Sequence, residues 1–269
     1  MTAQTTRRYV RFSRDGTPAY GVLDGDSVRE IAGPPYADAT PTGQLFALSQ
    51  VRLLVPCEPS KVIAAGLNYA SHRVHVESSE GSLRNAAGNP TSPDLPTIFA
   101  KFPSSLIAHG EDIVLPVDAT NVHFEGEMAL VIGRTAKNVS PRQAGDYVFG
   151  VTVCNDLVDR EWLLNDQQWF RAKGADGFGP IGPSIVTGLD FNNLKLETRV
   201  NGEVRQSSST RELVFSPSAI LSFCSRYVTL QPGDVIFTGT PGQTQAVKPG
   251  DTIEVEIEGI GVLRNRVAS

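Results

Sequence analysis

Two glutamates separated by a single residue, Glu125 and Glu127, lie inside a mostly apolar run at residues 122–132. Alternate side chains of a β-strand point to the same face, so the two carboxylates are expected side by side. Buried like charges repel each other and are costly to desolvate unless a cation cancels them. Asp156 follows a second apolar run, at 147–154, and supplies a third carboxylate. Three carboxylates suit a hard divalent cation, so the pattern indicates a site for Mg²⁺ or Mn²⁺.

The same spacing of glutamates also occurs on solvated strand faces. This chain contains an example, in which Glu254, Glu256 and Glu258 alternate with apolar residues. The segment 122–132 differs because apolar residues occupy both of its faces, which predicts a buried strand whose acids need a partner. On spacing alone, the metal site and the solvated face are comparable interpretations.

Bulk properties limit the function classes. The chain has 269 residues, enough for one large domain or for a domain with a small appendage. A net charge of −5 argues against nucleic-acid and anionic-membrane partners. No apolar run approaches the ~20 residues that span a bilayer, and the N-terminus lacks the apolar core of a signal peptide. Cys57, Cys154 and Cys224 are scattered, so we expect reduced, buried thiols in a cytoplasmic protein.

A small β-rich domain is expected at residues 1–57, where short apolar strands alternate with Asp-Gly turns. The strands are predicted at 9–12, 20–23 and 27–31, and a loop rich in Pro and Thr at 33–42. A second domain is expected at 58–269, beginning with a buried strand at 61–66.

The second domain is predicted to consist mainly of strands with a few helices. A helix is expected at 157–169, directly after Asp156. Ser140 and Ser216 each precede a proline, an arrangement typical of a helix N-cap followed by proline at the first helical position. The helix after Ser216 should end near Tyr227, with an inner face formed by Ile220, Phe223, Cys224 and Tyr227. Residues 78–96 show no periodicity, which predicts a lid, a binding loop or a disordered tip.

Several motifs occur in a fixed order over roughly residues 60–268. They are Gly66-Leu67-Asn68-Tyr69 with His72, Phe124-Glu125-Gly126-Glu127, Asn155-Asp156, Lys173-Gly174-Ala175-Asp176, Phe237-Thr238-Gly239-Thr240-Pro241 and the closing segment 256–265. As an ordered set they resemble the fumarylacetoacetate hydrolase family. The resemblance implies an α+β, mainly β fold, a mixed β-sandwich roll, and a homodimer. It also implies Mg²⁺ or Mn²⁺ held by Glu125, Glu127 and Asp156.

The motif positions imply roles for two cationic residues. Lys173 would be a catalytic cation facing the substrate, although a lone lysine is more often solvated. Arg160 would bind the substrate carboxylate, and the alternative is a surface ion pair with Asp159 or Glu161.

Three further residues are candidates for substrate binding. Thr240 could offer its hydroxyl or backbone N–H to the same carboxylate, or could simply complete a turn. Tyr69 and Phe178 either line the pocket or belong to the core. Leu163 and Gly177 stand where the family often has glutamine and threonine, which indicates a more apolar or larger substrate.

The lid motif departs from the family. The lid resembled here carries a histidine and, three residues later, a glutamate that together activate water. This chain has His72, but His75 follows it at that spacing, and Glu77 is the nearest acid. His72 alone, or with His75 or Glu77, is therefore the candidate general base. If water activation is lost, a reaction that needs no water would remain.

The resemblance implies an enzyme that acts on small 2-oxo acids or 1,3-dicarbonyl compounds. The first expectation is a divalent-metal-dependent hydrolase that cleaves a C–C bond in an acylpyruvate-type 2-oxo acid or 1,3-diketone. The alternatives are a metal-dependent decarboxylase, isomerase or lyase acting on an oxaloacetate-like 2-oxo acid, and a catalytically silent ligand-binding homologue.

Overall fold

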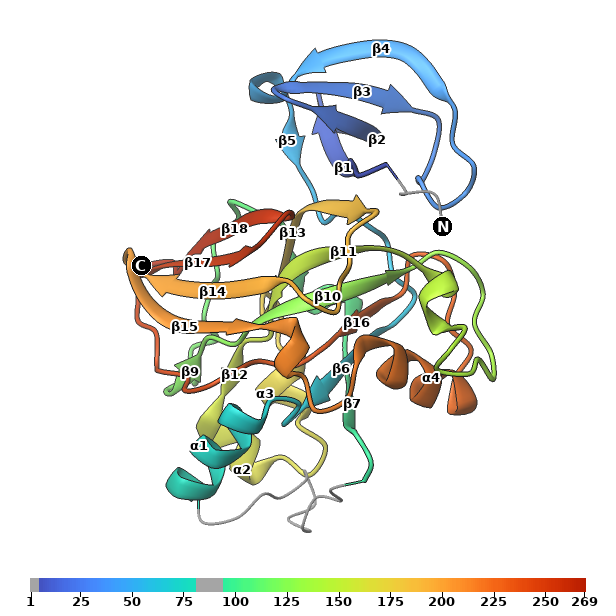
Figure 1. The fold of residues 1–269 in the computed structure, drawn as a ribbon. Coiled ribbons are helices and arrows are strands. Elements are labelled where there is room, and N and C mark those ends of the chain that lie inside the picture. Colours follow the sequence, from blue (N-terminus) through green and yellow to red (C-terminus); the bar gives the residue numbers. More distant parts are fainter. Residues whose placement is uncertain (1–4, 81–93) are drawn as a thin grey trace.

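Four antiparallel strands form a small β-rich module near the N-terminus. The computed structural model describes residues 5–80 and 94–269, and the module lies at the top of Figure 1. Its strands are β1 (Arg7–Arg14), β2 (Thr17–Asp24), β3 (Ser27–Ile31) and β4 (Pro41–Ala47). Asp15 and Gly16 turn the first hairpin with φ values of 50° and 83°, as the Asp-Gly pair predicts.

The fourth strand of this module was not expected, because the loop predicted at 33–42 gives way to β4 at Pro41. β4 lies at the edge of its sheet, and nearly all of its residues are exposed. It therefore lacks the alternation of apolar and polar residues that marks a half-buried strand. The core of the module is small and consists of Val10, Phe12 and Val28.

The strands of the module continue the largest sheet of the molecule, because β1 pairs with β13 (Gly179–Thr187). Strand order in this sheet is β4-β3-β2-β1-β13-β11-β10-β16-β6-β7. Its other members are β5 (Arg52–Leu53), β6 (Val62–Gly66), β7 (Thr97–Lys101), β8 (Leu106–Ile107), β10 (Gly126–Ile132), β11 (Val148–Asn155) and β16 (Val235–Phe237).

A second sheet has the order β15-β14-β17-β18, and two short strands, β9 and β12, pair with each other. These strands are β9 (Val122–His123), β12 (Val158–Asp159), β14 (Lys195–Val200), β15 (Glu203–Ser209), β17 (Thr252–Ile257) and β18 (Gly261–Arg266). Most pairs are antiparallel, but β6 and β16 run parallel. The fold is thus mainly β, and the predicted mixed β-sandwich roll is confirmed.

Strand β10 is buried on both faces. Met128 and Leu130 belong to the larger hydrophobic core, which also includes Val255 of the second sheet. Ala129 and Val131 face a second buried cluster. The apolar pattern on both faces therefore marked a central strand, and any acid on this strand lies in the interior.

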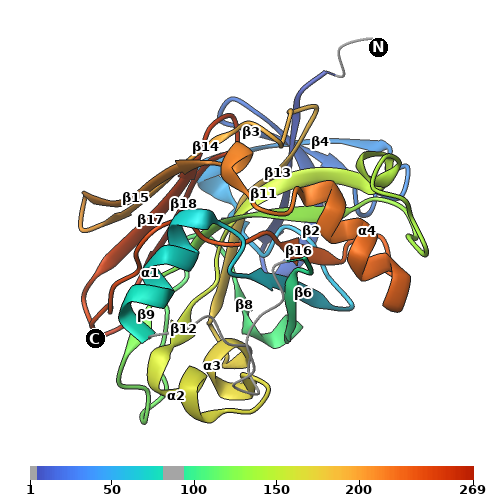
Figure 2. The same ribbon diagram turned by 60° about the horizontal axis from the view of Figure 1, so that its bottom comes forward.

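Helices gather at one end of the molecule, apart from α4, as Figures 1 and 2 show together. The helices are α1 (Ala70–Glu80), α2 (Arg160–Asn165), α3 (Phe170–Gly174) and α4 (Pro217–Tyr227), with 3₁₀ turns at Leu48–Gln50, Pro103–Ser105, Ala144–Tyr147 and Thr210–Glu212. α1 extends into the irregular segment expected at 78–96, and residues 81–93 lie outside the described part. No helix of the described residues is long and apolar enough to cross a membrane.

The prediction of a single helix at 157–169 is wrong, because a short strand and two short helices cover this region. Strand β12 comes first, and the Asp159 carboxylate then accepts a hydrogen bond from Trp162 N–H, so α2 begins at Arg160. A second interruption follows at Trp169, whose φ of 55° separates α2 from α3.

The two Ser-Pro pairs behave differently. Ser216 accepts a hydrogen bond from Ala219 N–H and begins α4, which ends at Tyr227 as predicted. The Ser140 hydroxyl instead donates to the side chain of Gln143, and only a 3₁₀ turn follows. The predicted inner face of α4 is partly wrong, because Tyr227 is 67% exposed. Ile220 and Cys224 are buried, together with Leu221.

A buried carboxylate ties β6 to β16. Asp234 accepts hydrogen bonds from the backbone N–H groups of Ser60, Lys61 and Gln231, and its second oxygen lies 2.6 Å from Lys61 Nζ. We expect Asp234→Ala to lower the free energy of unfolding by about 3 kcal/mol, because charged hydrogen bonds to buried groups are lost. Denaturant titration would measure this, with the exposed Asp118→Ala as the control. Equal stabilities of the two variants would contradict it.

Candidate metal centre

Three buried carboxylates lie close together where β10 begins and β11 ends. Glu125 directly precedes β10, Glu127 lies on it, and Asp156 directly follows β11. The two strands are antiparallel, with Gly126 opposite Asn155, so the three acids are brought to the same place. Carboxylate oxygens of the three residues lie within 4.8 Å of one another.

The residue between the two glutamates must be glycine. A Cβ atom on Gly126 would lie 2.1 Å from the hydroxyl oxygen of Thr198 and 3.0 Å from Val255. The second sheet therefore packs directly against the backbone at this point. This close packing excludes water from the rear of the site and fixes the strand that carries Glu127.

Three cationic side chains surround the carboxylates. Lys173 Nζ donates to a Glu125 oxygen at 2.6 Å and lies 2.9 Å from an Asp156 oxygen. Arg160 binds the other Glu125 oxygen at 2.9 Å. Lys101 Nζ lies 2.8 Å from the second oxygen of Asp156 and also donates to the backbone carbonyl of Lys173.

Lys101 was not predicted as a site residue. Its side chain is fully buried at the end of β7, a strand that otherwise consists mainly of apolar residues. A lysine that ends an apolar strand was the available signal, because a buried lysine needs an anionic partner. The partner, Asp156, is 55 positions away and could not be inferred from local sequence.

Glu127 has much less compensation than the other two acids. Burial raises the pKa of Glu127 well above its ordinary value, and the negative charge of Asp156 raises it further. Burial opposes ionisation of Glu125 as well, but Lys173 and Arg160 hold its pKa at about 2. Among the described residues, the hydrogen bond to the Glu127 carboxylate comes from Gly239 N–H at 2.6 Å. A divalent cation between the three acids would supply the missing charge, so the residues present fit a hard metal ion.

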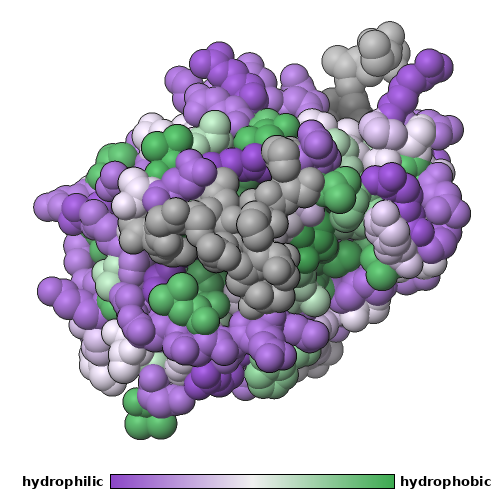
Figure 3. All heavy atoms as spheres, turned by 90° about the horizontal axis from the view of Figure 1, so that it is seen from below, coloured by the Kyte–Doolittle hydropathy of each residue, from purple (hydrophilic) through white to green (hydrophobic). Residues whose placement is uncertain are grey.

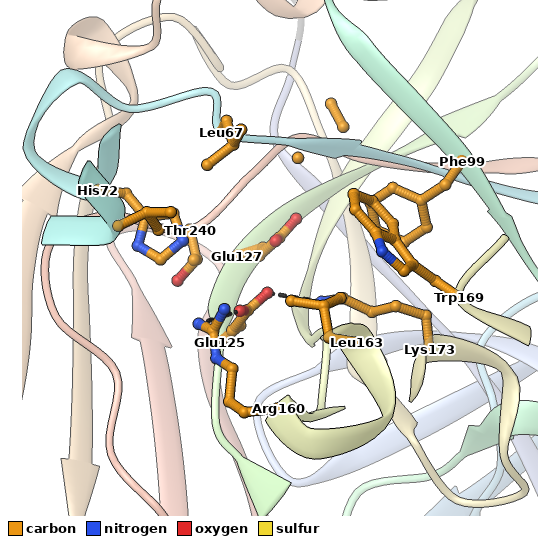
Figure 4. Close-up of a pocket in the computed structure, with 13 residues that line it drawn as sticks. Leu67, His72, Phe99, Glu125, Glu127, Arg160, Leu163, Trp169, Lys173 and Thr240 are labelled. Carbon is orange, nitrogen blue, oxygen red and sulfur yellow. Dashed lines mark hydrogen bonds and ion pairs between the residues drawn. The ribbon is translucent and has the colours of Figure 1, made fainter. Parts of the chain in front are cut away.

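Glu125 and Glu127, but not Asp156, line a pocket that Figure 4 shows in close-up. Its polar lining comprises His72, Glu125, Glu127, Arg160, Lys173 and Thr240. His72 and Thr240 lie on one side of the two glutamates, and Phe99 and Trp169 lie on the other. The pocket therefore has a polar side and an aromatic side.

The Nε2 atom of His72 is available to accept a proton. Its Nδ1 atom lies 2.7 Å from the carbonyl oxygen of Gly242, which can only accept, so Nδ1 carries the hydrogen. Burial lowers the pKa of His72 below its ordinary value, which favours the neutral ring. Neutral His72 therefore retains an unprotonated Nε2.

Comparison with known proteins identifies the family. Residues 61–268 match the family described as fumarylacetoacetate (FAA) hydrolase C-terminal, and residues 7–56 match the one described as Rv2993c-like, N-terminal. The chain belongs to the fumarylacetoacetate hydrolase family.

Relatives in this family have different activities. The chain is 39% identical to the mitochondrial oxaloacetate tautomerase Fahd2a of Rattus norvegicus, over 90% of this chain and 77% of that one. The 2-hydroxyhepta-2,4-diene-1,7-dioate isomerase of Mycobacterium marinum is 38% identical, with a TM-score of 0.87 and coverage of 97% and 98%. Maleylpyruvate hydrolase from Sphingobium sp. SYK-6, solved with manganese(II) and pyruvate, is 29% identical, with a TM-score of 0.78 and coverage of 97% and 98%.

Two residues predicted to bind the substrate, Arg160 and Thr240, line the pocket. Arg160 pairs with Glu125 and donates to Thr244, in place of the surface ion pair considered as its alternative. The Thr240 hydroxyl donates to Gly126 O and accepts from the buried Gln206 amide.

Four other predicted residues lie outside the lining. Tyr69 and Phe178 are almost fully buried, so the structure places them in the core, the second of the two positions considered for them. Apolar size alone could not separate these two alternatives. His75 and Glu77 lie on α1 with His72, but neither lines the pocket, and Glu77 is exposed. The apolar lining consists of six other residues: Ala65, Leu67, Val76, Phe99, Leu163 and Trp169.

Proposed function

We propose that this protein is a divalent-metal-dependent enzyme that forms and reprotonates the enolate of a 2-oxo acid. The reaction that its geometry supports best is keto–enol isomerisation. The observation that carries the proposal is a neutral histidine beside a compact set of buried, balanced charges. The tautomerase and isomerase activities for which two relatives are named support the same class.

The charges of the site favour the enolate over the starting acid. Three carboxylates and three cations, Lys101, Lys173 and Arg160, balance formally. A divalent ion would leave an excess of two positive charges. The enolate of a 2-oxo monoacid carries two negative charges, on its carboxylate and on its enolate oxygen, whereas the starting acid carries one. Stabilisation that grows as the enolate forms lowers the barrier to proton removal.

Individual residues would divide this work. Bound Mg²⁺ or Mn²⁺, held by Glu125, Glu127 and Asp156, would act as a Lewis acid towards adjacent ligand oxygens. Lys173 would hold Glu125 and Asp156 in position while placing its positive charge at the pocket wall. Arg160 and Thr240 would orient the substrate carboxylate. His72 would take the proton from carbon C3, and solvent would protonate the enolate oxygen to complete the enol; in the reverse direction the enol loses its O–H proton and protonated His72 delivers a proton to C3.

A second candidate is hydrolysis of a C–C bond in an acylpyruvate. The similarity to maleylpyruvate hydrolase favours it, and His72 could in principle deprotonate water. Isomerisation is preferred because His72 donates to a backbone carbonyl rather than to a carboxylate, and Glu77 lies outside the pocket lining. Water activation by a histidine–carboxylate pair therefore has less support than proton transfer.

Deuterium exchange tests the proposal directly. Pyruvate, oxaloacetate and longer 2-oxo acids would be incubated with the Mn²⁺-loaded protein in deuterated buffer and followed by NMR. Loss of the C3 proton signal without new products is the expected result. Two carboxylic acid fragments would indicate hydrolysis, and carbon dioxide release would indicate decarboxylation. Binding without exchange or turnover would indicate a silent ligand-binding protein and would overturn the proposal.

His72→Ala should lower the exchange rate about 10²-fold, which is typical for loss of a general base. Neutral His72 is the active form, and its pKa lies below the ordinary 6.5, so activity should decline only as the pH falls below that value. Steady-state rates between pH 5 and pH 9 would measure this in both proteins. His75→Ala is the matched control on the same helix and should retain the wild-type profile.

A further inference from the structure

Two bulky apolar residues of the pocket have a backbone conformation that such residues rarely adopt. Leu67 and Trp169 both have φ of 55°. The other non-glycine residues with positive φ in the described part are Asp15, Asp38, Asn138 and Asn201, which tolerate this region. Strain of this kind persists only where the surroundings enforce it, and it often marks a functional site.

The surroundings do enforce it. The neighbour of Leu67, Asn68, is buried, and its side chain exchanges hydrogen bonds with the backbone of Phe215 and donates to Thr238 O. Trp169 packs edge-on against Phe99, with ring centroids 5.2 Å apart at 80°. The fold thus holds both side chains at the pocket despite the backbone cost.

Both residues belong to the apolar part of the pocket lining, which we call the apolar wall. Phe99 lies beside Lys173, with Nζ 5.3 Å from the ring centroid, so the wall begins at the charged centre. Leu163 from α2 and Val76 from α1 complete it. Figure 4 shows Leu67 near Glu127, and Leu163 next to Glu125 on the side of Lys173. The face seen from below is largely hydrophilic, and a group of hydrophobic residues shows to the right of its middle (Figure 3).

In the part of the chain that the structure describes, the wall offers no positively charged partner for a second carboxylate. Among the described lining residues, the cations are Arg160 and Lys173, and both already bind Glu125. A carboxylate at the far end of a substrate would lie against aromatic and aliphatic groups and would lose its hydration without compensation. An alkyl or aryl group there would instead bury apolar surface.

We infer that the substrate is a 2-oxo acid whose arm beyond C3 is apolar, either branched or aromatic, and that this wall selects it over acids with a second carboxylate. This inference rests on the proposed function. It assigns Leu67, Leu163 and Trp169 to specificity, since they would contact the arm and not the reacting atoms.

Binding of substituted oxamates tests the preference for an apolar arm separately from the proposed function. Oxamate presents a carboxylate beside a carbonyl oxygen, as a 2-oxo acid does. Calorimetry with Mn²⁺-loaded protein would compare N-isobutyloxamate with N-carboxymethyloxamate, whose arm ends in a carboxylate. We expect the isobutyl compound to bind at least about tenfold more tightly. Equal affinity, or tighter binding of the acidic compound, would overturn the inference and leave the proposed function standing. If neither these compounds nor unsubstituted oxamate binds in a Mn²⁺-dependent manner, the proposed function fails as well.

Variants of neighbouring leucines localise the effect. Leu163→Gln should reduce the preference for the isobutyl compound at least about fivefold. Leu164→Gln is the matched control, because Leu164 is 69% exposed on the same helix and should retain the preference. Leu67→Gly removes a wall residue at a position where glycine accepts the backbone angle freely. The variant should stay folded and bind the isobutyl compound more weakly, while its affinity for the carboxymethyl compound stays the same. An equal loss of affinity for both compounds would contradict a role of Leu67 in specificity.

Discussion

Lys173→Met should lower the exchange rate of the proposed 2-oxo acid substrate about 10³-fold and the free energy of unfolding by about 3–5 kcal/mol. Lys173 binds Glu125 at 2.6 Å and Asp156 at 2.9 Å, and all three side chains are buried. Removing the lysine leaves two carboxylates without their shared partner, and it removes a positive charge from the place where the enolate would form.

Three measurements separate these effects. Single-turnover rates report the loss of catalysis, and denaturant titration in chelator reports the loss of stability. Repeating the titration with saturating Mn²⁺ should recover part of the stability, because the ion would compensate the same carboxylates. Lys195→Met is the control, since Lys195 is exposed and should affect neither quantity. A Lys173→Met protein with wild-type rate and stability would show that the lysine has neither role.

The convergence of the three acids was predictable because it depends on short-range rules. Alternation places Glu127 inside a strand that is apolar on both faces, and antiparallel pairing with the next strand brings in Asp156. Their partners could not be predicted in this way. Lys101 comes from β7 and Lys173 from α3, and only the tertiary fold brings these elements together.

Leu163 indicated an apolar substrate from the sequence, but the rest of the apolar wall could not be predicted. Leu67 and Trp169 are directed by positive φ angles, and nothing in the identity of a leucine or a tryptophan indicates that conformation. The same angle at Trp169 explains the error at 157–169, where a continuous helical pattern is broken by backbone geometry. Tyr69 and Phe178 are close in sequence to motif residues of the site, but their rings lie in the core.

Glu127→Gln should have opposite effects on stability with and without metal. In the metal-free protein, the raised pKa of Glu127 means that the folded state holds a proton more tightly than the unfolded state. Wild-type stability therefore falls as the pH rises above the ordinary carboxyl pKa of 4.5, because ionising Glu127 beside Asp156 is unfavourable. Glutamine cannot ionise, so the variant should be the more stable protein in chelator, and its advantage should grow from pH 5 towards neutrality.

Added Mn²⁺ should reverse this order. At a concentration about 100 times its dissociation constant, the ion would stabilise the wild type by about 2.7 kcal/mol. Loss of one carboxylate ligand should weaken Mn²⁺ binding at least about 100-fold, since even outer-shell changes cost 10–100-fold. Thermal unfolding of both proteins with EDTA and with Mn²⁺ would show whether the order of stability crosses. Glu256→Gln is the control, because Glu256 has the same glutamate spacing on an exposed face. A purely structural Glu127 predicts no crossing, so two proteins that keep the same order of stability in EDTA and in Mn²⁺ would refute the metal centre on which the proposed chemistry depends.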